Sequence, residues 1–106
     1  MNLIKKHKVA LTKICSDSNV DELYAFGSIL TDKFSSKSDI DFIVSFLSKD
    51  PIEYAEDYFK LKFGLEKIFQ RKIDLLELKA IKNRTFESLV NRNKKLVYGR
   101  RSKDVA

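Results

Sequence analysis

Apolar residues recur along this chain with a helical period in some segments and with strand-like density in others. Residues 3 to 15 carry apolar side chains at roughly helical spacing, separated by lysines, which predicts an amphipathic helix. The segment 20 to 26 runs up to Gly27, and we interpret its second half as a strand. Residues 40 to 47 are rich in β-branched and aromatic side chains and predict a second strand.

A longer helix is expected after the second strand. Asp50 can cap its first turn, Pro51 suits the first helical position, and Glu53 lies three residues after the cap. Apolar residues then recur at steps of four and three, which keeps one helix face apolar. A third strand is predicted over 72 to 78 and a last helix over 84 to 94. This order of elements indicates an α/β (α+β) fold with a crossover through the long helix.

Length and composition predict a single domain. The 106 residues include 43% hydrophobic residues, only three Gly and one Pro, and nothing in them reads as a linker or a repeat. We therefore expect one domain over residues 1 to 106, with residues 100 to 106 as a mobile tail.

The charge balance and the cysteine content narrow the classes of partner and compartment. The 21 Lys and Arg against 15 Asp and Glu give a net charge of +6, which favours an anionic partner. Cys15 is the only cysteine, so no disulfide can form within the chain, which fits a reducing cytoplasm. The N-terminal residues contain no uninterrupted apolar stretch and predict neither a signal peptide nor a membrane span. We expect a soluble cytoplasmic protein without membrane contact.

Two aspartates at the start of the second strand carry the first sign of chemistry. Alternate strand residues share a face, so Asp39 and Asp41 should point together while Ile40 and Phe42 point into the core. Neighbouring carboxylates repel each other on a poorly solvated sheet face, and a cation between them would remove that cost. Oxygen ligands without a cluster of His or Cys indicate Mg²⁺ or Mn²⁺ rather than zinc.

Two further features extend this candidate site. Asp74 interrupts the apolar third strand and can join Asp39 and Asp41 if the two strands are neighbours, which would give the ligands of a two-metal phosphoryl-transfer site. Gly27 lets the backbone approach a ligand closely, and the Ser28 hydroxyl with nearby backbone N–H groups can hold phosphate oxygens.

Each feature also has an ordinary structural interpretation. Gly-Ser alone is most often a turn, one aspartate such as Asp39 can simply open a strand, and Asp74 can be a charge that protects an edge strand. Three separate explanations of this kind would have to coincide in this order and spacing, so we favour the joint interpretation as a site.

In this order and spacing, Gly27-Ser28, the segment Ser38-Asp39-Ile40-Asp41-Phe42 and the later Asp74 resemble the signature of the DNA polymerase β-like nucleotidyltransferase superfamily, in its minimal nucleotidyltransferase (MNT) branch. The resemblance spans nearly the whole chain and implies that family's fold, a small mixed β-sheet packed against helices. It implies that Gly27 and Ser28 bind the β and γ phosphates of a nucleotide. Asp39 and Asp41 would contact the nucleotide and bind two Mg²⁺ ions, and Asp74 would join one metal and help to deprotonate an acceptor hydroxyl.

The resemblance also implies a donor and a partner. Small stand-alone members often form toxin–antitoxin pairs with a HEPN protein, in which the MNT partner adenylylates the HEPN toxin. This implies ATP as the donor and a HEPN toxin, in a hetero-oligomer, as the acceptor. The competing hypothesis is a non-catalytic antitoxin that neutralises its partner by binding and contacts RNA through its basic surface. Nucleic acid is otherwise not the expected partner, because basic tails are usually just solvated.

The chain departs from the family pattern just after Gly27-Ser28. Many members carry an arginine and a glycine there, whereas this chain has Ile29-Leu30-Thr31-Asp32. Neutralisation of the phosphates would then fall to the metals and to Lys33 or Lys37.

Overall fold

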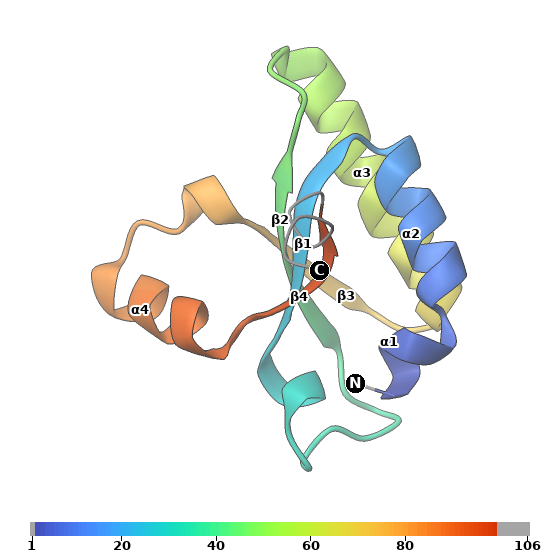
Figure 1. Ribbon diagram of the computed structural model, residues 1–106, viewed down its shortest axis with the longest axis vertical. Coiled ribbons are helices and arrows are strands. Elements are labelled where there is room, and N and C mark those ends of the chain that lie inside the picture. Colours follow the sequence, from blue (N-terminus) through green and yellow to red (C-terminus); the bar gives the residue numbers. More distant parts are fainter. Residues whose placement is uncertain (1, 100–106) are drawn as a thin grey trace.

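A four-stranded sheet in the order β3-β2-β1-β4 forms the centre of the computed structural model, which describes residues 2–99 (Figure 1). β1 pairs antiparallel with β2 and with β4, whereas β2 pairs parallel with β3, so the sheet is mixed as expected. The strands are β1 (Val20–Phe26), β2 (Ile40–Phe46), β3 (Ile73–Glu77) and β4 (Lys95–Gly99). The helices are α1 (Asn2–Lys6), α2 (Lys8–Asp17), α3 (Pro51–Phe69) and α4 (Arg84–Asn93), with short 3₁₀ helices η1 (Gly27–Leu30) and η2 (Leu78–Ala80).

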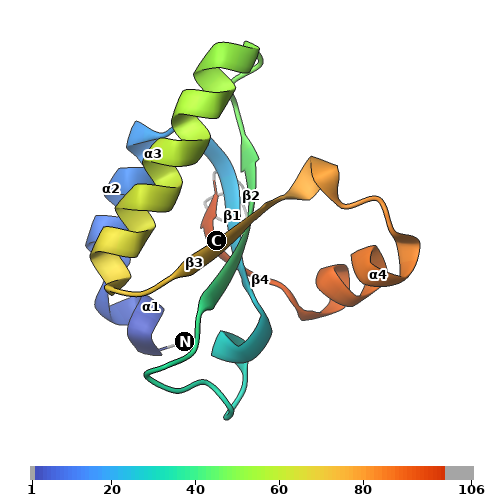
Figure 2. The same cartoon turned by 180° about the vertical axis from the view of Figure 1, so that it is seen from behind.

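One face of the sheet is covered by α2 and α3, which lie side by side (Figures 1 and 2). The core between the sheet and these helices consists of apolar side chains that are almost fully buried. It includes Leu11, Cys15, Leu23, Ala25, Ile40, Phe42, Val44, Leu61, Leu65, Ile73 and Leu75. Burial raises the pKa of the Cys15 thiol to about 12, which the charge of Lys8 partly offsets, so this cysteine is a packing residue.

A glycine within α3 lets the two covering helices approach closely. A Cβ atom on Gly64 would lie 2.5 Å from Cγ1 of Ile14 in α2. The cost of a glycine inside a helix is therefore offset by tight helix–helix packing.

The ends of α3 follow the signals in the sequence. The Asp50 side chain accepts a hydrogen bond from the backbone N–H of Glu53 at 3.1 Å, and Pro51 occupies the first turn. Gln70 takes the left-handed conformation that ends the helix, with φ 56°. Asp57, buried in the middle of α3, accepts hydrogen bonds from Asn19 and Ser48 and so ties the helix to the end of the β1–β2 pair where β1 begins and β2 ends.

In the part of the chain that the structure describes, α4 is the helix on the other face of the sheet, and it stands apart from α2 and α3 (Figures 1 and 2). The Phe86 ring of α4 packs edge-on against the Phe26 ring of β1, with 6.1 Å between ring centroids. Ile43 of β2 and Val90 of α4 are buried but do not belong to the main core cluster. This second apolar contact is small, and within residues 2–99 no further α-helix covers this face.

Two expectations about the elements were wrong. The predicted helix over 3 to 15 is divided at His7, whose ring contacts the Phe69 ring edge-on at 5.4 Å and is held against the end of α3. The second wrong expectation is the extent of β1, and one strand was missed altogether. β4 was not predicted: it is a short strand directly after α4, and its partner β1 lies far away in sequence. β1 also covers the whole of residues 20 to 26 rather than the second half. The tail expected over 100 to 106 lies outside the described residues. Among residues 2–99, no helix has the length and apolar character needed to cross a membrane.

Candidate active site

The carboxylates of Asp41 and Asp74 are brought together by the parallel pairing of β2 and β3. The two residues are direct register partners across these strands, so the adjacency that the sequence hypothesis required is present. The pKa of Asp41 is raised from 3.8 to about 6, first by burial, then by a hydrogen bond with the Asp74 carboxyl group and by the charges of Asp74 and Asp39. A shared proton or a bound cation is needed to hold two such groups together at neutral pH.

Asp39 lies just before β2, and its carboxylate is paired with a lysine rather than with Asp41 or Asp74. Its carboxylate is 3.9 Å from the Lys72 ammonium, and the two side chains are 44% and 68% exposed. Exposed pairs at this distance contribute little to stability, so Asp39 can exchange this partner for another cation at low cost. Within residues 2–99, no three acidic, His or Cys side chains are already gathered closely enough to hold a metal ion.

These carboxylates nevertheless fit a hard divalent cation. Asp41 and Asp74 can provide oxygen ligands from two adjacent strands, and the neighbouring charges that act on the pKa of Asp41 are those of Asp74 and Asp39, both acidic. Asp39 adds a third carboxylate whose charge is felt at Asp41. The donor set suits Mg²⁺ or Mn²⁺, with Asp41 and Asp74 as the preformed part of the site.

Gly27 lies directly against the Asp41 carboxylate at the end of β1. Its φ of +82° is in the left-handed region, which a residue with a side chain rarely adopts. A Cβ atom at this position would lie 2.5 Å from Oδ2 of Asp41. Glycine is thus required both by the backbone turn and by the space that the carboxylate occupies.

The turn that follows Gly27 is the short helix η1, which contains Ser28. The Ser28 carbonyl accepts hydrogen bonds from both the backbone N–H and the hydroxyl of Thr31, each at 2.9 Å. The side chain of Ser28 is half-buried beside Gly27. The structure therefore places the expected phosphate-binding pair next to the carboxylates.

The comparisons with known proteins agree with this geometry. Residues 10–103 match the model of the family described as polymerase beta, nucleotidyltransferase. The chain belongs to this family. The match confirms the family resemblance noted in the sequence, and a search of curated proteins found no match.

Solved structures show that this nucleotidyltransferase domain shares its fold with toxin–antitoxin proteins. A toxin–antitoxin crystal structure with AMP-PNP is 23% identical with a TM-score of 0.66, over 92% of this chain and 77% of that chain. The MntA–HepT toxin–antitoxin structure is 21% identical with a TM-score of 0.60, over 94% and 76% of the two chains. A structure named as a minimal nucleotidyltransferase is 20% identical with a TM-score of 0.69, over 86% and 89%.

Arg71 is a residue of this nucleotidyltransferase domain that the sequence did not single out. Its guanidinium donates hydrogen bonds to the carbonyls of Ser35 and Ser38, at 3.1 and 3.0 Å, and lies over the Phe34 ring at 4.9 Å. Arg71 thereby fastens the loop between η1 and β2 to the start of β3. That loop carries Lys33 and Lys37, the exposed side chains expected to meet phosphate.

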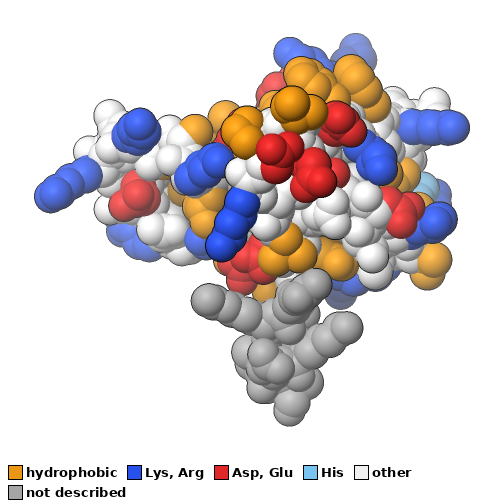
Figure 3. All heavy atoms as spheres, turned by 90° about the horizontal axis from the view of Figure 1, so that it is seen from above, with side chains coloured by type: hydrophobic (Ala, Val, Ile, Leu, Met, Phe, Trp, Pro, Cys, Tyr) orange, Lys and Arg blue, Asp and Glu red, His pale blue; other side chains and the backbone are white. Residues whose placement is uncertain are grey.

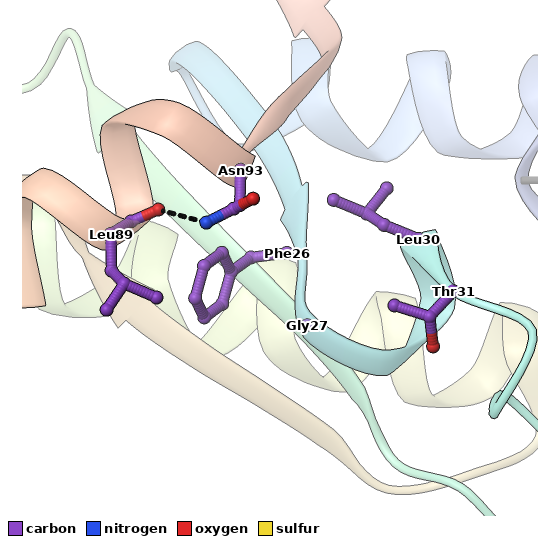
Figure 4. A pocket seen from close by; sticks show the side chains of 6 residues that line it. All are labelled: Phe26, Gly27, Leu30, Thr31, Leu89 and Asn93. Atoms are coloured by element: carbon purple, nitrogen blue, oxygen red, sulfur yellow. Dashed lines mark hydrogen bonds between the residues drawn. The ribbon is translucent and has the colours of Figure 1, made fainter.

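A cavity next to the acidic site was also missed in the sequence. It has a volume of about 300 Å³ and lies between η1 and α4 (Figure 4). Its lining residues are Phe26, Gly27, Leu30, Thr31, Leu89 and Asn93. They come from two segments far apart in sequence, and no motif in either segment predicts that the two segments lie together.

The surface charge near α4 is mostly positive. Seen from above, Lys and Arg side chains mark the end of the molecule that α4 forms, whereas several acidic side chains gather near the middle of this view (Figure 3). The segment around α4 contains Lys82, Arg84, Arg92, Lys94 and Lys95, with Glu87 as its only acidic residue. The positive charge favours an anionic partner on this side of the domain.

Proposed function

We propose that this domain is a Mg²⁺-dependent nucleotidyltransferase that transfers AMP from ATP to a hydroxyl group of a partner protein. The observation that carries the proposal is the pairing of Asp41 with Asp74 on adjacent strands, with Gly27 against the Asp41 carboxylate. Asp39, Asp41 and Asp74 would hold the metal, with Mn²⁺ as a substitute, and Gly27 and Ser28 would hold the β and γ phosphates. Family membership supports the reaction class.

Each residue has a role that follows from its position. When bound, Mg²⁺ would neutralise the carboxylates and withdraw charge from the phosphate oxygens. In the reaction, the acceptor oxygen forms a bond to the α-phosphorus while the bond from the α-phosphorus to the bridging oxygen of the leaving pyrophosphate breaks. Asp74 accepts the hydroxyl proton, and the backbone at Gly27 and the Ser28 hydroxyl orient the leaving pyrophosphate.

A protein acceptor is supported by the solved structures with the same fold and by the surface of α3. Two of those structures are toxin–antitoxin proteins, one of them named as MntA–HepT. On this chain, Ile52, Phe59 and Phe63 lie along one side of α3 and are 71%, 52% and 60% exposed. The Phe59 and Phe63 rings stack on each other at 5.8 Å. We infer that the partner is a HEPN toxin and that this apolar stripe contributes to its docking.

The second candidate function is an antitoxin that acts by binding alone. The observation that favours it is the contact of Asp39 with Lys72, which leaves only two carboxylates in direct contact, together with the absence of the family's arginine after Ser28. A binding-only antitoxin would bind its partner through the apolar stripe of α3 and would contact RNA through the basic segment around α4. It would leave its partner unmodified.

Transfer of label from ATP separates the two functions. The protein and its co-expressed partner would be incubated with ATP labelled at the α-phosphate, in Mg²⁺ and in EDTA. We expect labelling only with the metal, and a loss of about a hundredfold or more in Asp41→Asn, because removal of a metal ligand costs several kcal/mol at ~1.4 kcal/mol per tenfold in rate. Asp17→Asn, on the exposed end of α2, is the matched control and should label normally.

Labelling that is independent of metal or unchanged in Asp41→Asn would contradict the proposed enzyme. A tight complex without any gain of label or mass on the partner would favour the binding-only function.

A further inference from the structure

The cavity between η1 and α4 has the character of a binding site for a small planar group. Its volume of about 300 Å³ is at the lower end of the range of ~300–1,000 Å³ that is usual for ligand pockets. Phe26, Leu30 and Leu89 provide apolar walls, and the Phe26 ring is held in place by the edge-on contact with Phe86. Two polar side chains also line it: Thr31, whose hydroxyl donates to the Ser28 carbonyl, and Asn93, which adds a directional group.

This cavity adjoins the acidic site at Gly27. Gly27 lines the cavity, and the same residue lies against Oδ2 of Asp41. A ligand whose phosphates lie at Gly27 and Ser28 can therefore extend an apolar ring between η1 and α4. A nucleotide has the matching two ends, because its phosphate chain is charged and its base is a flat ring.

The hydrogen bonding of Asn93 leaves one of its polar atoms available to a ligand. Its amide nitrogen donates to the Leu89 carbonyl at 2.8 Å, and Figure 4 shows the nitrogen turned toward that carbonyl. Among residues 2–99, the amide oxygen has no hydrogen-bond partner. One of the two amide N–H groups is thus engaged, while the amide oxygen can accept a hydrogen bond from a base that carries an amino group.

We propose that this cavity binds the adenine base of the donor nucleotide, with Oδ1 of Asn93 accepting a hydrogen bond from the exocyclic amino group. The inference rests on the proposed function, because it names the base site of the same donor. It assigns a specificity role to Asn93 and wall positions to Leu30 and Leu89, outside the acidic and phosphate-binding residues.

The test is nucleotide binding followed by NMR and calorimetry, with α,β-methylene ATP and Mg²⁺ so that no transfer occurs. We expect the Asn93 side-chain amide and the methyl groups of Leu30 and Leu89 to shift, and nuclear Overhauser contacts between the adenine protons and Leu89. The matching triphosphate of purine riboside, which lacks only the amino group, should bind about tenfold more weakly, as expected for one lost hydrogen bond.

Two variants on the same helix make the test specific. Asn93→Ala should remove the preference for the amino group, so that both nucleotides bind alike. Asn91→Ala, an exposed residue of α4 that does not line the cavity, should keep the tenfold preference.

The outcomes separate this inference from the proposed function. Binding that shifts Gly27, Ser28 and the aspartates but leaves the cavity residues unchanged, or equal affinity for the two nucleotides in the wild type, would overturn the base site alone. Inorganic tripolyphosphate that binds as tightly as the ATP analogue would do the same. A protein that binds no nucleotide in Mg²⁺ would overturn both the inference and the proposed function.

Discussion

The two faces of the sheet differ in what they contribute to the molecule. On the face under α2 and α3, β2 presents Ile40, Phe42 and Val44, all fully buried in one continuous core. On the other face the same strand presents Asp41 and Ile43, and only α4 covers part of it. The alternation of a single strand thus separates the residues that stabilise the fold from those that form the candidate site.

This separation explains why a costly group is tolerated. Asp41 and Asp74 are held side by side although their charges repel each other, and the pKa of Asp41 is raised first by burial and then by the neighbouring Asp74. The covered face provides the stability that the open face lacks. The difference indicates that truncations on the covered face should cost far more stability than truncations on the other face, and that neutralising the acidic pair should raise stability while it removes activity.

The largest expected effect is on the covered face. Phe42→Ala removes a fully buried ring from the core and should lower the free energy of unfolding by ~3–5 kcal/mol. Leu89→Ala on the open face, where the side chain is 47% exposed, should cost less than ~1 kcal/mol. Urea unfolding followed by circular dichroism measures both, and equal losses would show that the two faces do not differ as described.

A smaller effect of opposite sign is expected for the acidic pair. The pKa of Asp41 is about 6 in the fold against an ordinary value of 3.8, so the folded protein holds this proton more tightly than the unfolded chain does. The stabilising contribution of the protonated form is complete below about pH 4 and is lost as the pH rises through about 6.

Asp41→Asn in EDTA should therefore be more stable than the wild type at pH 7.5, by about 1 kcal/mol once solvent screening of this partly exposed group is allowed for. The advantage should disappear near pH 4. Thermal melts at both pH values test this, with Asp17→Asn as the control. If the Asp41 variant melts lower at pH 7.5, the carboxylate is an ordinary structural residue.

The acidic residues of the candidate site and the start of α3 could be predicted from the sequence. Asp41 and Asp74 could each be assigned to a strand because each interrupts an apolar run, and the sequence predicted a crossover through the long helix. The adjacency of the two strands was a condition of the hypothesis, and the parallel register of β2 and β3 shows it. The Asp50 cap and Pro51 marked the start of α3 correctly. These are local signals, in which the residue type itself carries the structural preference.

The missing parts depend on contacts between distant segments. β4 is defined by its pairing with β1, and the cavity forms only where Phe26 meets Leu89 and Asn93. The contact of Asp39 with Lys72 and the clamp of Arg71 on Ser35 and Ser38 likewise join residues more than thirty positions apart. No periodicity or motif in one segment encodes such a contact, so it emerges only from the assembled fold.

The most direct test of the acidic site is an NMR titration of the Asp41 carboxyl carbon, first in EDTA and then in excess Mg²⁺. Without metal, this group should titrate with a pKa of about 6 because burial and the Asp74 carboxyl group disfavour its charge. With Mg²⁺, the pKa should fall below that value, because a bound cation favours the ionised form. The Asp17 signal controls for general effects of salt. An Asp41 carboxyl group that titrates near 3.8 and does not respond to Mg²⁺ would contradict the metal site on which the proposed function rests.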